Sequence, residues 1–154
     1  MLLSGLMQLD NKMTKVYIAG PLFNQHERER LNEIAEVLES DGYDCFLPHR
    51  DQTGLDPEER GKPHANLKQK TKDILFQDDI SALEPADIVV AIITGQDIDS
   101  GTAAEIGYAY ALKKPIIAID ANESRFRNLF VASMISRTIN GVSELLDTIK
   151  DEGL

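Results

Sequence analysis

The sequence is poor in cysteine and aromatic residues: it has one cysteine, Cys45, no tryptophan, and 6% aromatic residues in 154. A single thiol excludes an intrachain disulfide and a cysteine metal cluster, and it suits a reducing, cytoplasmic location. The three histidines, His26, His49 and His64, are scattered without the paired spacing of metal ligands. The sequence therefore predicts no metal site.

Long hydrophobic runs and positive charge are also scarce. No stretch reaches the ~18 apolar residues of a membrane-spanning helix, and the N-terminus lacks the basic start of a signal peptide. We therefore expect no membrane association. Sixteen basic residues against 26 acidic ones give a formal net charge of −10. Because nucleic-acid affinity rests on Lys and Arg at phosphates, this balance argues against nucleic-acid partners and leaves uncharged nucleosides and bases as acceptable ligands.

The composition that remains, 42% hydrophobic and 27% charged, is typical of one globular domain. We predict a flexible tail over residues 1–12 and a single domain over 13–154. Short apolar runs alternate with helical patterns along that domain. The predicted strands cover residues 15–19, 44–47, 87–94, 115–119 and 138–139. The predicted helices cover residues 25–40, 66–83, 102–112, 128–135 and 142–150.

This alternation predicts an α/β fold of the flavodoxin/Rossmann-like kind: one parallel sheet of about five strands with helices on both faces. Ligands of such sheets bind beyond the carboxyl ends of the strands, near the point where the strand order reverses. The loops after Ala19, Leu47, Thr94 and Ile119 should therefore surround the site. The polar loop over residues 49–64 is a further candidate because of its length.

The most informative segment is DIDSGTAAEIGYA over residues 97–109, where the strongest buried strand leads into a helix. We predict Glu105 in the first helical turn, where the helix dipole and free N–H groups favour its ionised form. An ionised carboxylate at the mouth of a cleft suits covalent glycosyl transfer. The alternative interpretation is a capping box, since Thr102 and Glu105 have its spacing. Asp97 and Asp99 could equally be solvated loop acids.

Other polar positions also have two interpretations. The Tyr17 hydroxyl could reach a carboxylate at the sheet edge, or Tyr17 could be a half-buried aromatic residue on a strand. One of Asp78 and Asp79 could face the cleft, although adjacent acids on a helix are more often solvated. His49 could contact a base or be a plain loop residue. Asn128 has the alternative of a helix N-cap.

Together these residues resemble the nucleoside 2-deoxyribosyltransferase family. The order and spacing hold over roughly residues 14–148, and the piece from Asp99 to Gly107 is the most specific. The matching segments are VYIAGPLF from Val16, Asp79 in the helix before Asp87-Ile88-Val89-Val90, DSGTAAEIG from Asp99, and Asn128-Leu129.

The resemblance implies a transferase that exchanges the base of 2'-deoxynucleosides, with purine or pyrimidine deoxynucleosides and free bases as partners. Glu105 would be the nucleophile that forms a deoxyribosyl ester, and Tyr17 would orient it. Asp79 and Asp99 would bind the base or the sugar, one of them supplying the proton that the base needs to depart. This chemistry needs no metal or organic cofactor.

The resemblance also implies substrate contacts and assembly. Gly20, Pro21, Phe23 and Gly101 would line the substrate site. Asn128 would contact the sugar 5'-hydroxyl in a neighbouring subunit's site, because family members are oligomers with sites completed across interfaces. We therefore expect a homo-oligomer, a dimer or higher, with a role in nucleotide salvage.

Two rival functions remain. The first is a hydrolase of 2'-deoxynucleoside 5'-monophosphates, which should have a Gly, Ser and Arg phosphate nest at the first loop. Here that loop has Phe23 and no serine, and Arg28 and Arg30 stand among acids, which favours a neutral nucleoside. The second is a non-catalytic flavodoxin-like binding or signalling module. Against it, no cluster of acids follows the first strand.

Overall fold

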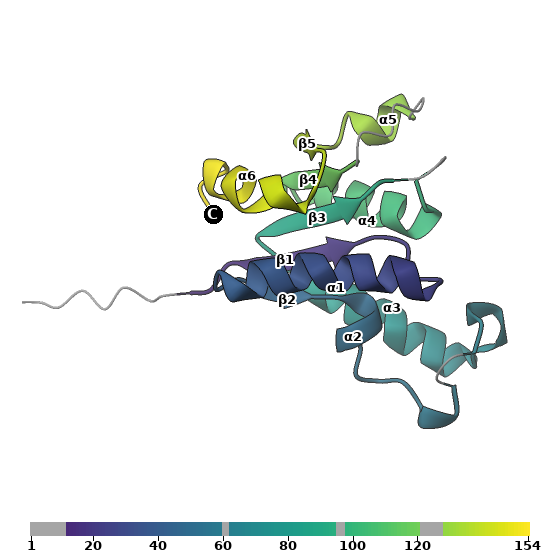
Figure 1. Cartoon of the computed structure of the whole chain (residues 1–154). Helices are drawn as coiled ribbons and strands as arrows, with labels where there is room; N and C mark the ends of the chain where they lie inside the picture. Colours follow the sequence, from purple (N-terminus) through teal and green to yellow (C-terminus); the bar gives the residue numbers. More distant parts are fainter. Residues whose placement is uncertain (1–11, 60–61, 95–97, 121–127) are drawn as a thin grey trace, which may run out of the picture.

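The computed structural model describes residues 12–59, 62–94, 98–120 and 128–154 (Figure 1). Of the predicted tail, only Lys12 lies within these ranges. The described residues form the strands β1 Lys15–Ala19, β2 Asp44–Phe46, β3 Ile88–Ile92, β4 Ile116–Ile119 and β5 Arg137–Ile139. Their α-helices are α1 Gln25–Ser40, α2 Pro48–Asp51, α3 Gln69–Leu83, α4 Ser100–Ala111, α5 Leu129–Ala132 and α6 Leu145–Asp151. No helix in the described ranges is long and apolar enough to cross a bilayer.

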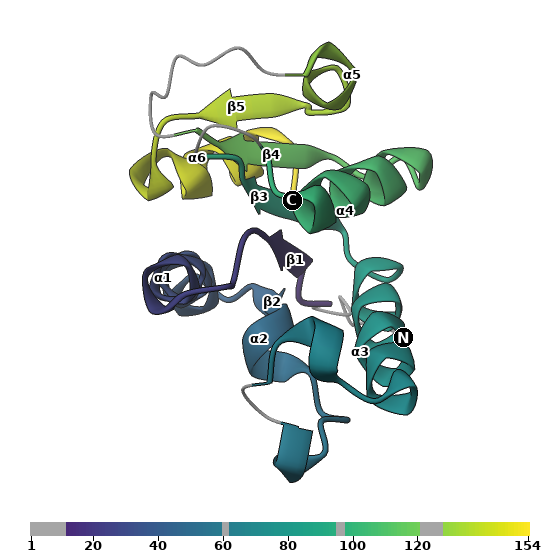
Figure 2. The ribbon, with the colours of Figure 1, turned by 90° about the vertical axis from the view of Figure 1, so that its right-hand side faces the viewer.

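The five strands form one parallel sheet in the order β2-β1-β3-β4-β5. Helices α1 and α6 cover one face of this sheet, and α3 and α4 cover the other (Figure 2). The predicted fold class is thereby confirmed. From β1 the chain goes to β2 on one side and then to β3 on the other, so the strand order reverses beside β1. A ligand site is expected at the carboxyl ends of β1 and β3.

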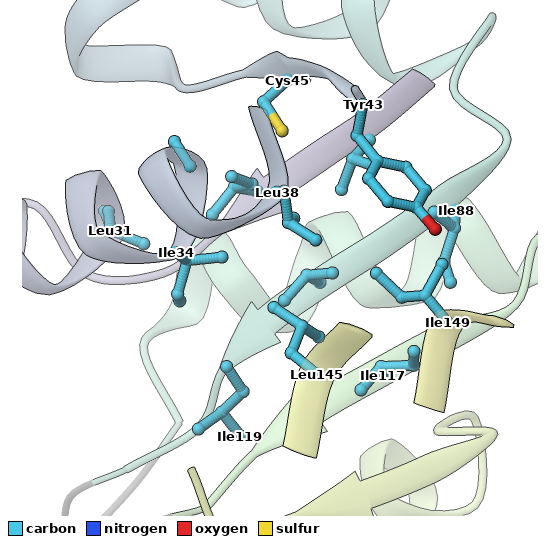
Figure 3. Close-up of a cluster of buried hydrophobic side chains, with 14 of the residues drawn as sticks. Leu31, Ile34, Leu38, Tyr43, Cys45, Ile88, Ile117, Ile119, Leu145 and Ile149 are labelled. Atoms are coloured by element: carbon cyan, nitrogen blue, oxygen red, sulfur yellow. The ribbon is translucent and has the colours of Figure 1, made fainter. Parts of the chain in front are cut away.

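The face under α1 and α6 is a hydrophobic core (Figure 3). Alternate residues of each strand point to it, such as Val16 and Ile18 of β1, because successive strand side chains face opposite ways. The helices contribute residues three or four apart, as the predicted helical face requires. These are Leu31, Ile34 and Leu38 of α1 and Leu145 and Ile149 of α6. Each such side chain contributes on the order of 1.5–3 kcal/mol by burial.

The opposite face carries the intervening strand residues against α3 and α4. The side chains on this face include three small ones, those of Ala19, Ala91 and Ala118. Because they project little from the sheet, α4 can lie close to the strands. Tyr17 of β1 belongs to the same face and is fully buried. The alternation of β1 therefore turns a tyrosine toward α4, and the candidate site is built on this side.

The described residues between β2 and α3 contain more regular secondary structure than the loop predicted over residues 49–64. Pro48 starts the short helix α2, and two 3-10 turns follow at Pro57–Glu59 and His64–Asn66. The predicted helix from residue 66 begins at Gln69 instead. The reason is local: the Leu67 N–H bonds the His64 carbonyl and closes the second 3-10 turn before α3 starts.

Candidate active site

A cavity of about 670 Å³ lies at the carboxyl ends of β1, β2 and β3, where the strand order predicts a site. A volume of this size is typical of small-molecule sites. Its walls come from the segments that follow those three strands and from α3 and α4. The lining residues are Gly20, Leu22, Phe23, Pro48, Gln52, His64, Ala65, Leu67, Lys72, Leu75, Asp79, Asp99, Ser100, Gly101, Thr102 and Glu105.

Glu105, which lines this cavity, contacts Tyr17, 88 residues away in the chain. The Tyr17 hydroxyl donates a hydrogen bond of 2.7 Å to Oε1 of Glu105. The Tyr17 ring stacks on Phe46 of β2, with ring centroids 5.6 Å apart, so the hydroxyl has a fixed direction. One carboxylate oxygen of Glu105 is thus held by a rigid donor.

The start of α4 differs from the sequence prediction in a way that removes the capping-box interpretation of Glu105. The N-cap is Asp99, whose Oδ2 accepts hydrogen bonds from the Thr102 N–H at 3.1 Å and from the Thr102 hydroxyl at 3.3 Å. The helix begins at Ser100, two residues before the predicted start. Glu105 is therefore in the second turn, and its carboxylate bonds Tyr17 rather than a helix N–H.

The predicted preference of Glu105 for its ionised form is wrong. Burial raises the pKa of its carboxyl to about 7, and the charges of Asp79 and Asp99 raise it further, while the Tyr17 hydrogen bond lowers it. Desolvation dominates because the side chain has left water and lies beyond the first turn, where the helix dipole acts. Glu105 therefore exchanges its proton near neutral pH.

Asp79 of α3 is a second carboxylate with a shifted pKa. Burial raises the pKa of Asp79 to about 6, with a contribution from Asp78, while hydrogen bonding by Gln52 opposes the rise. The Gln52 Nε2 donates to Oδ1 of Asp79 at 2.8 Å. Of the adjacent acids, Asp79 is the one that lines the cavity, whereas Asp78 accepts a hydrogen bond from the Thr53 N–H. A pair of acids with raised pKa values in one cavity is typical of a catalytic site.

Gln52 is a site residue that the sequence analysis did not identify. It follows α2 within the segment that matches no recognisable pattern, and it reaches Asp79 across 27 residues of chain. A lone glutamine in a polar loop has no sequence signal of its own. Only the tertiary contact reveals it.

The remaining predicted residues are placed as follows. Gly20, Phe23 and Gly101 line the cavity, and Pro21 lies between two lining residues. Asn128 does not line it: its side chain caps α5 by accepting from the N–H groups of Phe130 and Val131. Asp97 lies outside the described residues, and the ring of His49 forms a hydrogen bond of 2.9 Å with Asn32.

Gly20 shows why the turn after β1 needs a glycine. A Cβ at this position would lie 2.8 Å from Cδ2 of Leu31 and 3.3 Å from Cβ of Ile92. The chain therefore passes directly over the core between α1 and β3 as it leaves the sheet. This close approach brings the following residues, Leu22 and Phe23, to the rim of the cavity.

A second cavity of about 550 Å³ adjoins the first between α3 and α4. It shares Asp79, Gly101 and Glu105 with the first, and its other walls are mainly apolar, with Phe76 and Leu83 among them. Asp79 and Glu105 thus lie between the two cavities. The apolar walls of the second cavity explain why both carboxyl groups are desolvated.

Replacing Tyr17 by phenylalanine tests the role of its hydroxyl. Tyr17→Phe keeps the stacking on Phe46 but removes the hydrogen bond that lowers the pKa of Glu105. We expect that pKa to rise, the acid limb of the pH–rate profile to move to higher pH, and kcat/KM to fall roughly 10- to 100-fold. Tyr108→Phe is the control, because the Tyr108 hydroxyl donates to exposed Glu84 from the same helix α4. Identical profiles for the two variants would contradict the assigned role.

The fold and site together define a class of protein. A parallel α/β domain that buries a tyrosine-bound carboxylate beside a second acid at its strand ends has the groups of an enzyme acting on glycosidic bonds. A family model described as nucleoside 2-deoxyribosyltransferase matches residues 16–146. The chain belongs to this family, which confirms the resemblance seen in its motifs.

Individual relatives are similar over most of the chain. A nucleoside deoxyribosyltransferase of Limosilactobacillus fermentum is 27% identical over 111 residues, 69% of this chain and 64% of that protein. A Thermofilum pendens protein, named provisionally as a 2'-deoxynucleoside 5'-phosphate N-hydrolase, is 29% identical over 71% of this chain and 69% of its own length. The match thus spans slightly less than two thirds of the Limosilactobacillus protein. The solved structure of a 2-deoxyribosyltransferase from Bacillus psychrosaccharolyticus superimposes with a TM-score of 0.73 at 25% identity, covering 86% of this chain and 90% of that one.

Proposed function

We propose that this chain is an N-glycosyl transferase that exchanges the base of 2'-deoxynucleosides through a covalent deoxyribosyl–Glu105 intermediate. The observation that carries the proposal is the buried Tyr17–Glu105 pair, with Asp79 in the same cavity. The family of the chain supports it, since nucleoside deoxyribosyltransferases are among its relatives.

In the first half-reaction the free oxygen of Glu105 attacks C1' while the base leaves with the electron pair of the C1'–N bond. The oxocarbenium-like state is stabilised by the ionised carboxylate and then trapped as an ester. The protonated form of Asp79, which its raised pKa makes accessible near neutral pH, gives its proton to the departing base. The Tyr17 hydroxyl holds Oε1 of Glu105, which leaves Oε2 for the bond to sugar.

In the second half-reaction a nitrogen of the incoming base attacks C1', the ester C–O bond breaks, and its electron pair returns to Glu105. The proton on the attacking nitrogen goes to Asp79, which restores the starting state. Two displacements retain the configuration at C1', and the separate stages give ping-pong kinetics. No step calls for a metal or an organic cofactor.

The cavity walls support a division of the substrate into base and sugar. Pro48, Ala65, Leu67 and Leu75 form an apolar surface on the side of Asp79, which suits a flat base. On the other side Asp99, Ser100 and Gly101 offer polar and small groups for the sugar. We propose that Gln52 orients Asp79 toward the base and that Asp99 contacts sugar hydroxyls.

The start of α1 supports an uncharged nucleoside over a nucleotide. Helix N-termini bind phosphate through free N–H groups. Here Oε2 of Glu27 accepts from the N–H groups of Phe23 at 2.8 Å and Asn24 at 3.2 Å, and Asn24 in turn caps the helix. These donors are already bonded to a carboxylate. Hydrolysis of nucleoside 5'-monophosphates is the second candidate function, favoured by the Thermofilum pendens relative.

We also propose a homo-oligomer in which Asn128 serves a neighbouring subunit. In support, Asn128 lies outside the lining of its own chain's cavity, and the next residues, Leu129 and Phe130, are 78% and 74% exposed. Large apolar side chains at this exposure are typical of contact surfaces. We place the reaction in the cytoplasm, within nucleotide salvage, where the Cys45 thiol stays reduced.

Incubation of the protein with deoxyinosine, with and without adenine, tests the proposal, with the products separated by chromatography. We expect deoxyadenosine only when adenine is added. Release of hypoxanthine at one rate in both mixtures, with no new nucleoside, would instead indicate a hydrolase. A reaction with deoxynucleoside 5'-monophosphates alone would establish the second candidate.

A further inference from the structure

Glu59 is a buried acid that the proposed reaction does not use. It lies in the 3-10 turn Pro57–Glu59, far from Glu105 in the sequence, and its side chain is only 1% exposed. A carboxylate is rarely buried unless hydrogen bonds or opposite charges compensate it. The contacts that compensate the charge of Glu59 therefore indicate its structural role.

The hydrogen bonds of the Glu59 carboxylate lead to the start of α3. The Lys68 N–H donates to both carboxylate oxygens, at 3.3 and 3.2 Å, and the Thr71 side chain hydrogen-bonds the same group. Lys62 adds an ion pair of 3.8 Å. Lys68 is the N-cap of α3 and has no capping side chain of its own. Glu59, nine residues earlier, provides the carboxylate that this helix end lacks.

The anchored segment is the wall of the cavity on the side of Asp79. His64, Ala65 and Leu67 immediately precede Lys68 and line the cavity, and Lys72 and Leu75 line it from the first turns of α3. Because Glu59 bonds Lys68 and Thr71, it fixes the chain at the end of the segment that carries His64, Ala65 and Leu67. Neither Tyr17 nor Glu105 takes part in these bonds.

We propose that Glu59 is a positioning residue for base recognition: by bonding the start of α3 it fixes the end of the segment that carries His64, Ala65 and Leu67, and so determines how tightly the base is bound. This inference rests on the proposed function for the identity of the ligand. Thr71 first and then the Lys68 N–H hold the pKa of Glu59 below its ordinary value. Its carboxylate is therefore ionised at neutral pH, and the anchor is present above the ordinary pKa of a glutamate and weakens only in acid.

The test compares Glu59→Ala with Glu58→Ala, a change of the exposed acid one residue earlier. In base exchange between deoxyinosine and adenine, Glu59→Ala should raise the KM values roughly tenfold and leave kcat within about threefold, since the Tyr17–Glu105 pair is untouched. Glu59→Gln keeps an acceptor oxygen and should recover part of the affinity. Amide hydrogen exchange over residues 62–68 should become faster in Glu59→Ala and stay unchanged in Glu58→Ala.

Hydrogen exchange needs no turnover, so it tests the anchor even if wild type proves unable to exchange bases, a result that would reject the proposed function by itself. If Glu59→Ala does not fold, Thr71→Val, which removes only the hydroxyl donor, takes its place and should give a smaller change in the same direction. A lower melting temperature with KM values and amide exchange equal to those of Glu58→Ala would overturn the inference. A loss in kcat of Glu59→Ala as large as its rise in KM would also overturn the inference.

Discussion

Glu105→Ala should abolish base exchange, lowering the rate by at least about 10⁴-fold. The variant lacks the group that stabilises and traps C1', and nucleophile deletions have effects of this size. The measurement is the rate of deoxyadenosine formation from deoxyinosine and adenine. Glu33→Ala, which removes an exposed acid from α1, is the matched control and should retain the wild-type rate. A Glu105→Ala rate within tenfold of wild type would exclude the covalent mechanism.

A change at Glu105 that abolishes activity should nevertheless raise the stability of the fold. The pKa of Glu105 is raised from 4.5 to about 7, so folding favours its protonated form, and the folded protein loses stability as the pH rises through this window. The difference corresponds to roughly 3 kcal/mol once Glu105 is ionised. Glu105→Gln keeps an acceptor for the Tyr17 hydroxyl and removes the charge. It should therefore raise the melting temperature at pH 8 and change it little at pH 4.5.

Asp79→Asn should lower the rate by about 10²–10³-fold, the usual contribution of a general acid. Wild type should show a bell-shaped profile of kcat/KM with its maximum between about pH 6 and 7, because the productive state holds one proton on the Asp79 and Glu105 pair. The variant should lose the alkaline limb, since asparagine has no proton to give up. The limb that remains should report the ionisation of Glu105 alone.

Two comparisons make the Asp79 result specific. Asp78→Asn removes the same charge one residue earlier on α3 and should keep both limbs, with a rate within about threefold of wild type. A deoxynucleoside of 7-methylguanine carries a cationic base that leaves without further protonation, so Asp79→Asn should slow its cleavage far less. Equal losses on deoxyinosine and on the methylated substrate would show that Asp79 acts in binding rather than in proton transfer.

Much of the fold could be predicted because its signals are local. The run Ile88–Ile92 is apolar at every position, which indicates a central strand buried on both faces, and it lies in the middle of the sheet. Leu31, Ile34 and Leu38 predict α1 by their spacing. The segment from Asp99 to Gly107 pointed to Glu105 because strand ends and helix starts are where such sheets hold their ligands.

The electrostatic state of the site was decided by tertiary structure. The sequence predicted an ionised Glu105 from its distance to a helix start, but its pKa depends on how many atoms of β1, α3 and α4 exclude water from it. Gln52 and Asp79 are 27 residues apart, and Glu59 caps a helix that begins ten residues later. The sequence alone determined which segments form strands and helices, which of their faces pack in the core, and the family motif. It could do so because periodicity and spacing are properties of neighbouring residues. Desolvation, capping from a distance and the meeting of Tyr17 with Glu105 came only with the packed fold, because they arise between segments that no local pattern connects.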